Sequence, residues 1–117
     1  MLVLQSLWGW FESLRSAAEQ ASTHGFDGLE CNVMHPCLQG VDAAEVRQLL
    51  SAHGLVLILE ITTGGDYTPD LADGPQRHLQ QLEDLLGRAH ALEPLKINLI
   101  TGSDTWPEPE QHRFLEA

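Results

Sequence analysis

The run Leu55–Ile61 limits the folds open to this chain more than any other segment, because it is apolar at every position except Glu60. A strand with one face in water alternates apolar and polar residues, whereas a parallel strand buried on both faces is apolar almost throughout. The run therefore predicts a parallel strand that is covered on both sides. Parallel strands are joined by long crossover connections, which are usually helices.

Three further stretches of β-forming residues lie at 2–7, 28–33 and 95–100. Between the strands, apolar residues recur at the spacing of one helix face. The predicted faces are Phe11, Leu14, Ala17, Ala18 and Ala21 in the first helix, Val46, Leu49 and Leu50 in the second, and Leu79, Leu82, Leu85, Leu86 and Ala89 in the third. Strands that alternate with helices at this spacing predict an α/β fold with right-handed crossovers.

The first two helices are expected to end in the same way, at the pairs His24-Gly25 and His53-Gly54. Glycine supplies the left-handed residue of a helix C-cap, and histidine is favourable near the negative end of the helix dipole. A strand with a glutamate follows each pair, Glu30 after the first and Glu60 after the second. This weak internal repeat is expected where one strand–helix unit is used twice.

The last segment has the features of a helix start without those of a helix end. Thr105 is a good N-cap, prolines follow it in the first turn, and acidic residues lie near the positive end of the dipole. The sequence stops about two helical turns later, without a glycine cap. We therefore expect residues 1–117 to form a single partial domain that is truncated in its fourth helix.

The charge of the chain argues against several classes of partner. Six Lys and Arg residues stand against seventeen Asp and Glu residues, and the formal net charge is −11. Affinity for nucleic acids rests mainly on cations that neutralise phosphates, and the cations of this chain form no cluster. We therefore expect neither a nucleic acid nor an anionic membrane surface as a partner.

Other features of the sequence favour a cytoplasmic protein. No apolar run approaches the roughly 20 residues needed to span a bilayer, and the first residues lack the basic start of a signal peptide. Cys31 and Cys37 are the two cysteines, fewer than a secreted scaffold of this size would usually carry. We expect both to be free thiols in a reducing cytoplasm.

The phrase Gly25–Glu30, which reads Gly-Phe-Asp-Gly-Leu-Glu, resembles the xylose isomerase-like TIM-barrel superfamily, which includes sugar phosphate isomerases and epimerases. Members of that superfamily commonly begin their second strand with such a phrase. The segment Lys96–Trp106 also looks like the family, where a strand that ends in a glycine turn precedes an acidic helix start. The resemblance implies the N-terminal four-strand half of a TIM (β/α)8 barrel.

The resemblance also implies where a site would lie. In a TIM barrel, the functional residues lie in the loops after the carboxyl ends of the strands. This rule selects Glu30 and His35 as candidate catalytic residues. The candidate substrate-binding residues are Trp8, Glu60, Asn98, Asp104 and Trp106.

The activity implied by the resemblance is isomerisation or epimerisation of a small sugar, a sugar phosphate or a hydroxy-keto acid. Family members usually bind a divalent metal (Mn, Mg, Co or Zn) through residues of the fifth to eighth strands. This chain lacks those strands, so no metal ligand can be assigned to a numbered residue. We therefore expect the metal in the full-length parent and not in this chain alone, which would then be inactive.

Each candidate residue also has a purely structural interpretation. A carboxylate within a parallel strand, such as Glu30 or Glu60, is costly to bury unpaired, and it could orient substrate, share a proton, or make an internal hydrogen bond or ion pair. His35 precedes a proline in a loop and could be an acid–base group or an ordinary loop residue. Trp8 and Trp106 could form walls of a sugar pocket or pack in the core. The spacing of Cys31, His35 and Cys37 is not that of a standard zinc site, and a fourth ligand is missing.

Two other functions remain open at this point. Four strand–helix units form an open sheet with exposed edges, so the chain could associate with itself as a non-catalytic half-barrel. An endonuclease IV-like DNA repair protein would share the superfamily, but the acidity of this chain fits that function poorly.

Overall fold

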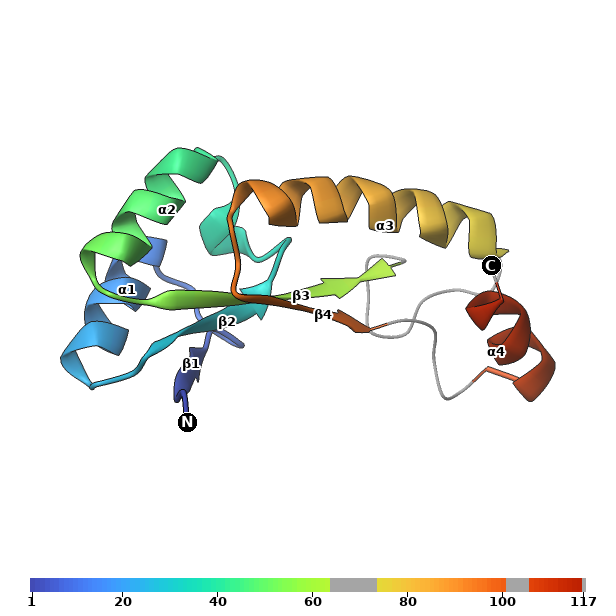
Figure 1. Cartoon of the computed structure of the whole chain (residues 1–117), viewed down its shortest axis with the longest axis horizontal. Coiled ribbons are helices and arrows are strands. Elements are labelled where there is room, and N and C mark those ends of the chain that lie inside the picture. Colours follow the sequence, from blue (N-terminus) through green and yellow to red (C-terminus); the bar gives the residue numbers. More distant parts are fainter. Residues whose placement is uncertain (64–73, 101–105, 117) are drawn as a thin grey trace.

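The computed structural model describes residues 1–63, 74–100 and 106–116. Strands and helices alternate along these residues (Figure 1). The elements in chain order are β1 (Leu4–Ser6), α1 (Leu14–Thr23), β2 (Gly28–Asn32), the 3₁₀ helix η1 (Pro36–Leu38), α2 (Ala43–Ala52), β3 (Val56–Thr62), α3 (Gly74–Ala91), β4 (Lys96–Ile100) and α4 (Glu108–Leu115).

The four strands form one parallel sheet in the order β1-β2-β3-β4, so the predicted α/β class with parallel strands is confirmed. Consecutive right-handed crossovers that always step in the same direction place their helices on the same face of a sheet. The core agrees with this arrangement. Leu29, Leu57 and Leu59 of the sheet are buried in one cluster with side chains of the helices, including Val46 and Ala89.

The opposite face of the sheet is not covered to the same extent. Along β3, Leu57, Leu59 and Ile61 are buried, whereas the residues between them are only half-buried. The apolar run had predicted a strand buried on both faces, and in the described part of the chain this holds for one face only. The second face carries apolar Val56 and Ile58 but has no helix packed on it among the described elements.

The two His-Gly pairs have the predicted geometry. Gly25 and Gly54 follow α1 and α2 with φ angles of +76° and +64°. The ring Nδ1 of His24 lies 2.8 Å from the carbonyl oxygen of Gln20, and that of His53 lies 2.9 Å from the carbonyl oxygen of Leu49. Each histidine thus lies at the end of its helix, as predicted, and its ring hydrogen-bonds to a carbonyl of the last turn.

Two residues were wrongly assigned to helix faces. Phe11 lies before α1 and is 95% exposed, because the side chain of Ser13 accepts a hydrogen bond from the N–H of Ser16 and the helix begins only at Leu14. Leu79 of α3 is 38% exposed, and the buried stripe of that helix begins with His78 instead. Hydrophobicity alone favoured Leu79, but the hydroxyl of Thr63 lies 2.9 Å from His78 Nδ1 and gives that nitrogen of the buried imidazole a partner.

The phrase Gly25–Glu30 has a structural explanation in this sheet. The backbone and side chain of Asp27 pair with the backbone of Val3, and its carbonyl accepts a hydrogen bond from Val56 N–H, so this residue joins three strands. A Cβ atom at Gly28 would lie 2.4 Å from the carbonyl oxygen of Val56. The phrase therefore contains residues that the packing of adjacent strands requires.

The fourth helix lies away from α1 and α2, near the amino-terminal end of α3 (Figure 1). It begins at Glu108 after Pro107 and carries Glu108 and Glu110 in its first turn, as predicted from the dipole, while Thr105 lies outside the described residues. The chain is elongated, with a radius of gyration of 15.7 Å, whereas a compact domain of this length would have about 13.4 Å. Within the described residues, no helix combines the length and apolarity needed to cross a membrane.

Candidate functional site

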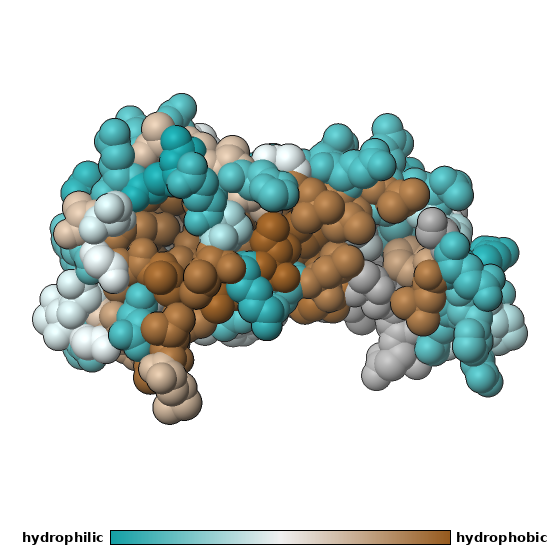
Figure 2. Space-filling model, in the orientation of Figure 1, coloured by the Kyte–Doolittle hydropathy of each residue, from teal (hydrophilic) through white to brown (hydrophobic). Residues whose placement is uncertain are grey.

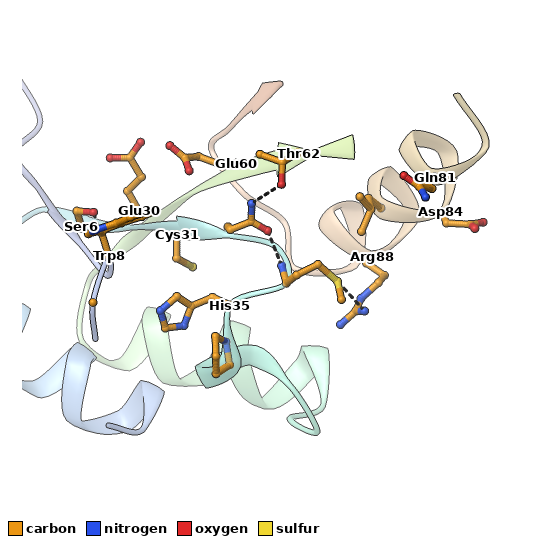
Figure 3. Close-up of a pocket in the computed structure, with 15 residues that line it drawn as sticks. Ser6, Trp8, Glu30, Cys31, His35, Glu60, Thr62, Gln81, Asp84 and Arg88 are labelled. Carbon is orange, nitrogen blue, oxygen red and sulfur yellow. Dashed lines mark hydrogen bonds between the residues drawn. The ribbon is translucent and has the colours of Figure 1, made fainter. Parts of the chain in front are cut away.

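A pocket of about 870 Å³ lies at the carboxyl ends of β1, β2 and β3. Residues from the strand ends, from the loop after β2 and from one side of α3 surround it (Figure 3). Its described lining is Ser6, Trp8, Gly9, Glu30, Cys31, Asn32, Met34, His35, Pro36, Glu60, Thr62, Gln81, Asp84, Leu85 and Arg88. Four of the seven candidate residues predicted from the sequence line this pocket, namely Trp8, Glu30, His35 and Glu60.

Glu30 and Glu60 belong to adjacent strands and point to the same side of the sheet (Figure 3). In the register of the sheet, Glu30 lies beside Ser6, and Glu60 lies between Asn32 and Asn98. Because partners in a parallel register share a face, these side chains form a polar group on the face without helices. The Cα atoms of the two glutamates are offset by two residues across neighbouring strands, or roughly 8 Å apart.

The two carboxylates are not equivalent. Among the described residues, no hydrogen bond or ion pair engages the carboxylate of Glu30, whereas Glu60 does have an interaction partner. An internal hydrogen bond, the structural alternative for Glu30, is therefore not formed within the described part of the chain. Glu30 is half-buried at the pocket, where a ligand can reach it.

Asn32 organises the loop that follows β2. Its side-chain nitrogen donates to Thr62 Oγ1 at 3.1 Å, and its side-chain oxygen accepts from the N–H of Met34 at 2.9 Å. One amide thus joins the ends of β2 and β3 and directs the chain toward His35. Thr62 was not proposed from the sequence, although its position at the end of a strand was a sufficient signal.

Arg88 brings a positive charge to the pocket from α3. Its guanidinium donates to Met34 Sδ at 3.2 Å and to Gln39 Oε1 at 3.1 Å, which ties α3 to the loop after β2. Arg88 was not among the candidates predicted from the sequence. Gln81, Asp84 and Arg88 are spaced by three and four residues, so they share one side of the helix, and this polar edge beside the apolar stripe was visible in the sequence.

His35 lines the pocket, but both nitrogens of its ring are engaged by the protein. Nε2 lies 2.9 Å from the carbonyl oxygen of Leu7, which can only accept, so Nε2 carries the proton of the neutral ring. Nδ1 accepts from the N–H of Cys37 at 3.1 Å and lies 3.0 Å from the Cys37 sulfur. The ring therefore caps η1 and holds the loop against β1, and these contacts fix it without a substrate.

The remaining candidates from the sequence are dispersed. Trp8 lines the pocket and is 77% exposed, so its ring is accessible to a ligand. Asn98 lies on the same face as Glu60 but is not among the described lining residues. Trp106 is only 7% exposed and packs against His78 and Phe114 between α3 and α4, away from the pocket. Asp104 lies outside the described residues.

Cys31 and Cys37 are both free thiols, but their environments differ. A hydrogen bond from the Cys31 side chain, together with the adjacent His35, lowers the pKa of Cys37 to about 6. The same hydrogen bond, burial and the nearby carboxylates of Glu60 and Glu30 raise the pKa of Cys31 far above its ordinary value. Cys37 is thus the member of the pair that carries the negative charge at neutral pH.

Comparisons with protein-family models, curated proteins and solved structures found no match to this chain. Among the described residues, no three His, Cys, Asp or Glu side chains are grouped so as to hold a metal ion. The described residues therefore do not provide a ligand set for the divalent metal that the resemblance implies. The pocket is defined by its carboxylates, amide and hydroxyls.

Proposed function

We propose that this chain forms part of a cytoplasmic isomerase or epimerase that acts on a small sugar, a sugar phosphate or a hydroxy-keto acid. The observation that carries the proposal is the pair Glu30 and Glu60 in one open pocket at the carboxyl ends of parallel strands. Moving a proton between adjacent carbons requires a carboxylate that can accept the proton and return it. Glu30, at the pocket and without a partner among the described residues, suits that role.

The other lining residues fit a polyhydroxylated substrate. Ser6 and Thr62 offer hydroxyls, and the exposed ring of Trp8 offers an apolar surface for the C–H face of a sugar. Arg88 also lines the pocket, from α3 on the helix-covered side of the sheet, and suits a substrate that carries a carboxylate or phosphate. In this arrangement Glu30 transfers the proton, Glu60 and the hydroxyls orient the substrate, and Arg88 binds an anionic end.

We further propose that the sheet is one half of a (β/α)8 barrel. On the face without helices, Val56 and Ile58 lie toward the amino end of β3, and Glu60 and Thr62 lie toward its carboxyl end. A barrel interior has the same order, with packed apolar layers below a polar catalytic rim. In the complete barrel, the ligands of a divalent metal would come from outside the described residues, and no step above depends on that metal.

Proton exchange into the substrate tests the proposed chemistry. The product of the complete gene would be incubated in D₂O, with and without Mn²⁺, with aldoses, ketoses, their phosphates and hydroxy-keto acids. Proton NMR would then follow the C–H signal next to the carbonyl. We expect that signal to disappear for at least one substrate. Glu30→Gln should slow its loss by about 100-fold or more.

Glu19→Gln provides a matched control, because Glu19 is an exposed carboxylate on α1, away from the pocket. It should exchange protons at the wild-type rate. Absence of exchange with every compound would refute the isomerase proposal. Equal rates for Glu30→Gln and the wild type would remove Glu30 from the mechanism.

A second candidate function is self-association as a half-barrel. Several large apolar side chains are exposed, and Figure 2 shows hydrophobic surface gathered along the middle of one face. They include Leu2, Val3, Leu95, Leu99 and Ile100, which lie on or next to the edge strands β1 and β4. Size-exclusion chromatography with light scattering tests this candidate, and a stable monomer at micromolar concentration would exclude it.

A further inference from the structure

The segment from β2 to η1 holds a second group of reactive side chains, which the proposed isomerase chemistry does not use. The side chain of Cys31 points to the helix-covered side of β2, whereas that of the preceding residue, Glu30, points to the other side (Figure 3). Cys37 is the second residue of η1, and His35 lies between the two in sequence and contacts Cys37. The side chains of Cys31 and Cys37 hydrogen-bond to each other, so two thiols and an imidazole lie together beneath the sheet.

The imidazole is arranged as a base for the Cys37 thiol. The carbonyl of Leu7 fixes the Nε2–H tautomer of His35, so Nδ1 carries no proton; it accepts from the N–H of Cys37 and also lies 3.0 Å from the Cys37 sulfur. A nucleophile beside a base that a third group orients is the arrangement that activates cysteine in many enzymes. Transfer of the thiol proton to Nδ1 leaves a thiolate next to an imidazolium.

The two thiols differ in access as well as in charge. Cys37 is half-buried and lines a groove of about 910 Å³ between α1 and α2. Cys31 is 4% exposed and lines the pocket at the strand ends, not that groove. A small reagent in the groove therefore meets Cys37 first, and Cys31 is positioned behind it.

We propose that Cys37 is a peroxide-reactive nucleophile and that Cys31 is its resolving thiol, so that a hydroperoxide converts the pair into an intrachain disulfide. The Cys37 thiolate attacks the terminal oxygen of the hydroperoxide, the O–O bond breaks, and the alkoxide leaves with the proton held on His35 Nδ1. Cys37 is then a sulfenic acid and the hydroperoxide has become an alcohol, or water in the case of hydrogen peroxide.

The second step closes the disulfide. The sulfur of Cys31 attacks the sulfur of Cys37, the S–O bond breaks, and hydroxide leaves as water with the proton of the Cys31 thiol. The two cysteines together lose two electrons, which the hydroperoxide accepts. Oxidation of Cys37 removes the thiolate whose hydrogen bond most strongly raises the pKa of Cys31, so the resolving thiol becomes easier to ionise at this step.

Mass spectrometry of the peroxide-treated protein tests this proposal. After a stoichiometric amount of hydrogen peroxide, peptide mapping should find Cys31 joined to Cys37, and a dithiol should reverse the bond. In Cys31→Ser, which keeps a hydrogen-bond donor beside Cys37, the reaction should stop at the sulfenic acid, and dimedone should label Cys37. In Cys37→Ser, Cys31 should stay reduced under the same treatment.

Alkylation supplies a readout that does not depend on a variant. At pH 6, the fraction of Cys37 present as thiolate is about 160-fold larger than that of an ordinary thiol. A more acidic thiolate is also a weaker nucleophile, which reduces this advantage in rate by about ten-fold. Iodoacetamide should therefore modify Cys37 in the folded protein roughly ten times faster than in urea-unfolded protein. A disulfide that fails to form in the folded wild type, or dimedone labelling at Cys31 instead of Cys37, would overturn the proposal.

Discussion

The side-chain amide of Asn32 donates a hydrogen bond of 3.1 Å to the hydroxyl of Thr62, which joins the carboxyl ends of β2 and β3 at the pocket. The other end of the same amide accepts from the N–H of Met34. Both sides of the amide are therefore used to hold the rim on which Glu30 and Glu60 lie. The pocket depends on this residue for its shape, even if Asn32 never touches a substrate.

Replacement of Asn32 by alanine should cost about 2 kcal/mol of unfolding free energy, because two hydrogen bonds of about 1 kcal/mol each are lost. Urea denaturation followed by circular dichroism measures the change. Asn98→Ala is the matched control, since Asn98 lies in the next strand on the same face without such bonds among the described residues. It should change stability by less than about 0.5 kcal/mol. Equal effects of the two substitutions would show that the amide network contributes nothing.

A second prediction concerns the close approach of strands at Gly28. A Cβ atom there would lie 2.4 Å from Val56 O, 2.6 Å from Val56 Cγ2 and 2.9 Å from Leu4 Cδ2. Two of these atoms belong to the backbone or to a stiff β-branched side chain, so the strands themselves must move apart. Gly28→Ala should therefore destabilise the protein by about 1–3 kcal/mol, as overpacking of a core does.

Gly87→Ala is the control for that substitution. Gly87 lies within α3, and a Cβ atom added to it meets nothing within 4 Å. Alanine there should stabilise the protein by roughly 0.5–1 kcal/mol through helix propensity. The two Gly→Ala substitutions should thus shift the thermal midpoint in opposite directions. A shift in the same direction for both would contradict the packing described for β1, β2 and β3.

The pattern of elements could be predicted from the sequence because each signal was local. Helical spacing, the two His-Gly pairs and the apolar run at Leu55–Ile61 indicated a parallel α/β fold, and the sheet confirms it. The error at Phe11 was also local, because it came from the choice of the residue that begins the helix. Ser13 determines where α1 begins and thereby excludes Phe11 from the helix.

The location of the candidate site could be predicted from the sequence, but the contacts of its individual residues could not. The rule that parallel strands gather their carboxyl ends at one edge located Glu30 and Glu60 in the pocket. Trp106 was assigned to the same edge because it follows β4 in sequence, yet it packs under α4. The role of Arg88 depends on contacts with residues about 50 positions earlier in the chain, and that of Cys37 depends on its distance from His35 across a turn. Neither distance can be predicted from the local sequence pattern.

The pH dependence of Cys37 reactivity is a third prediction. Because the pKa of Cys37 is lowered to about 6, its alkylation rate should rise as the pH increases through 6 and level off above it. The hydrogen bond from Cys31 lowers the pKa of Cys37 most, and the adjacent His35 lowers it further. The other charged or titratable groups along the groove are Glu12, Arg15, Glu45 and His53.

Substitution of Cys31 separates these contributions. Cys31→Ala removes the hydrogen bond and should move the midpoint of the alkylation profile upward, toward the value of about 8.5 of an ordinary thiol. Cys31→Ser retains a donor and should keep the midpoint nearer to 6. Iodoacetamide labelling of Cys37 between pH 5 and 9, quantified by mass spectrometry, measures both profiles. An unchanged midpoint in Cys31→Ala would show that His35 alone sets the acidity of Cys37.

The contact between α3 and α4 leads to a fourth prediction. The ring of Phe114 lies 5.0 Å from that of His78 and 5.4 Å from that of Trp106, in edge-to-face arrangements. These three rings form the described attachment of α4 to the rest of the chain, since most of the helix surface is exposed. Phe114→Ala removes two aromatic contacts of about 1 kcal/mol each and should release α4 before the sheet unfolds.

Hydrogen exchange locates that effect. In Phe114→Ala, amides of residues 108–115 should exchange roughly ten- to thirty-fold faster, since about 2 kcal/mol of local stability is lost, while β2 and β3 keep their protection. Leu115→Ala is the control, because Leu115 is exposed on the same helix and outside the aromatic cluster. It should leave exchange in α4 within about two-fold of wild type. If Phe114→Ala accelerated exchange in the sheet and in α4 equally, α4 would belong to the same cooperative unit as the core.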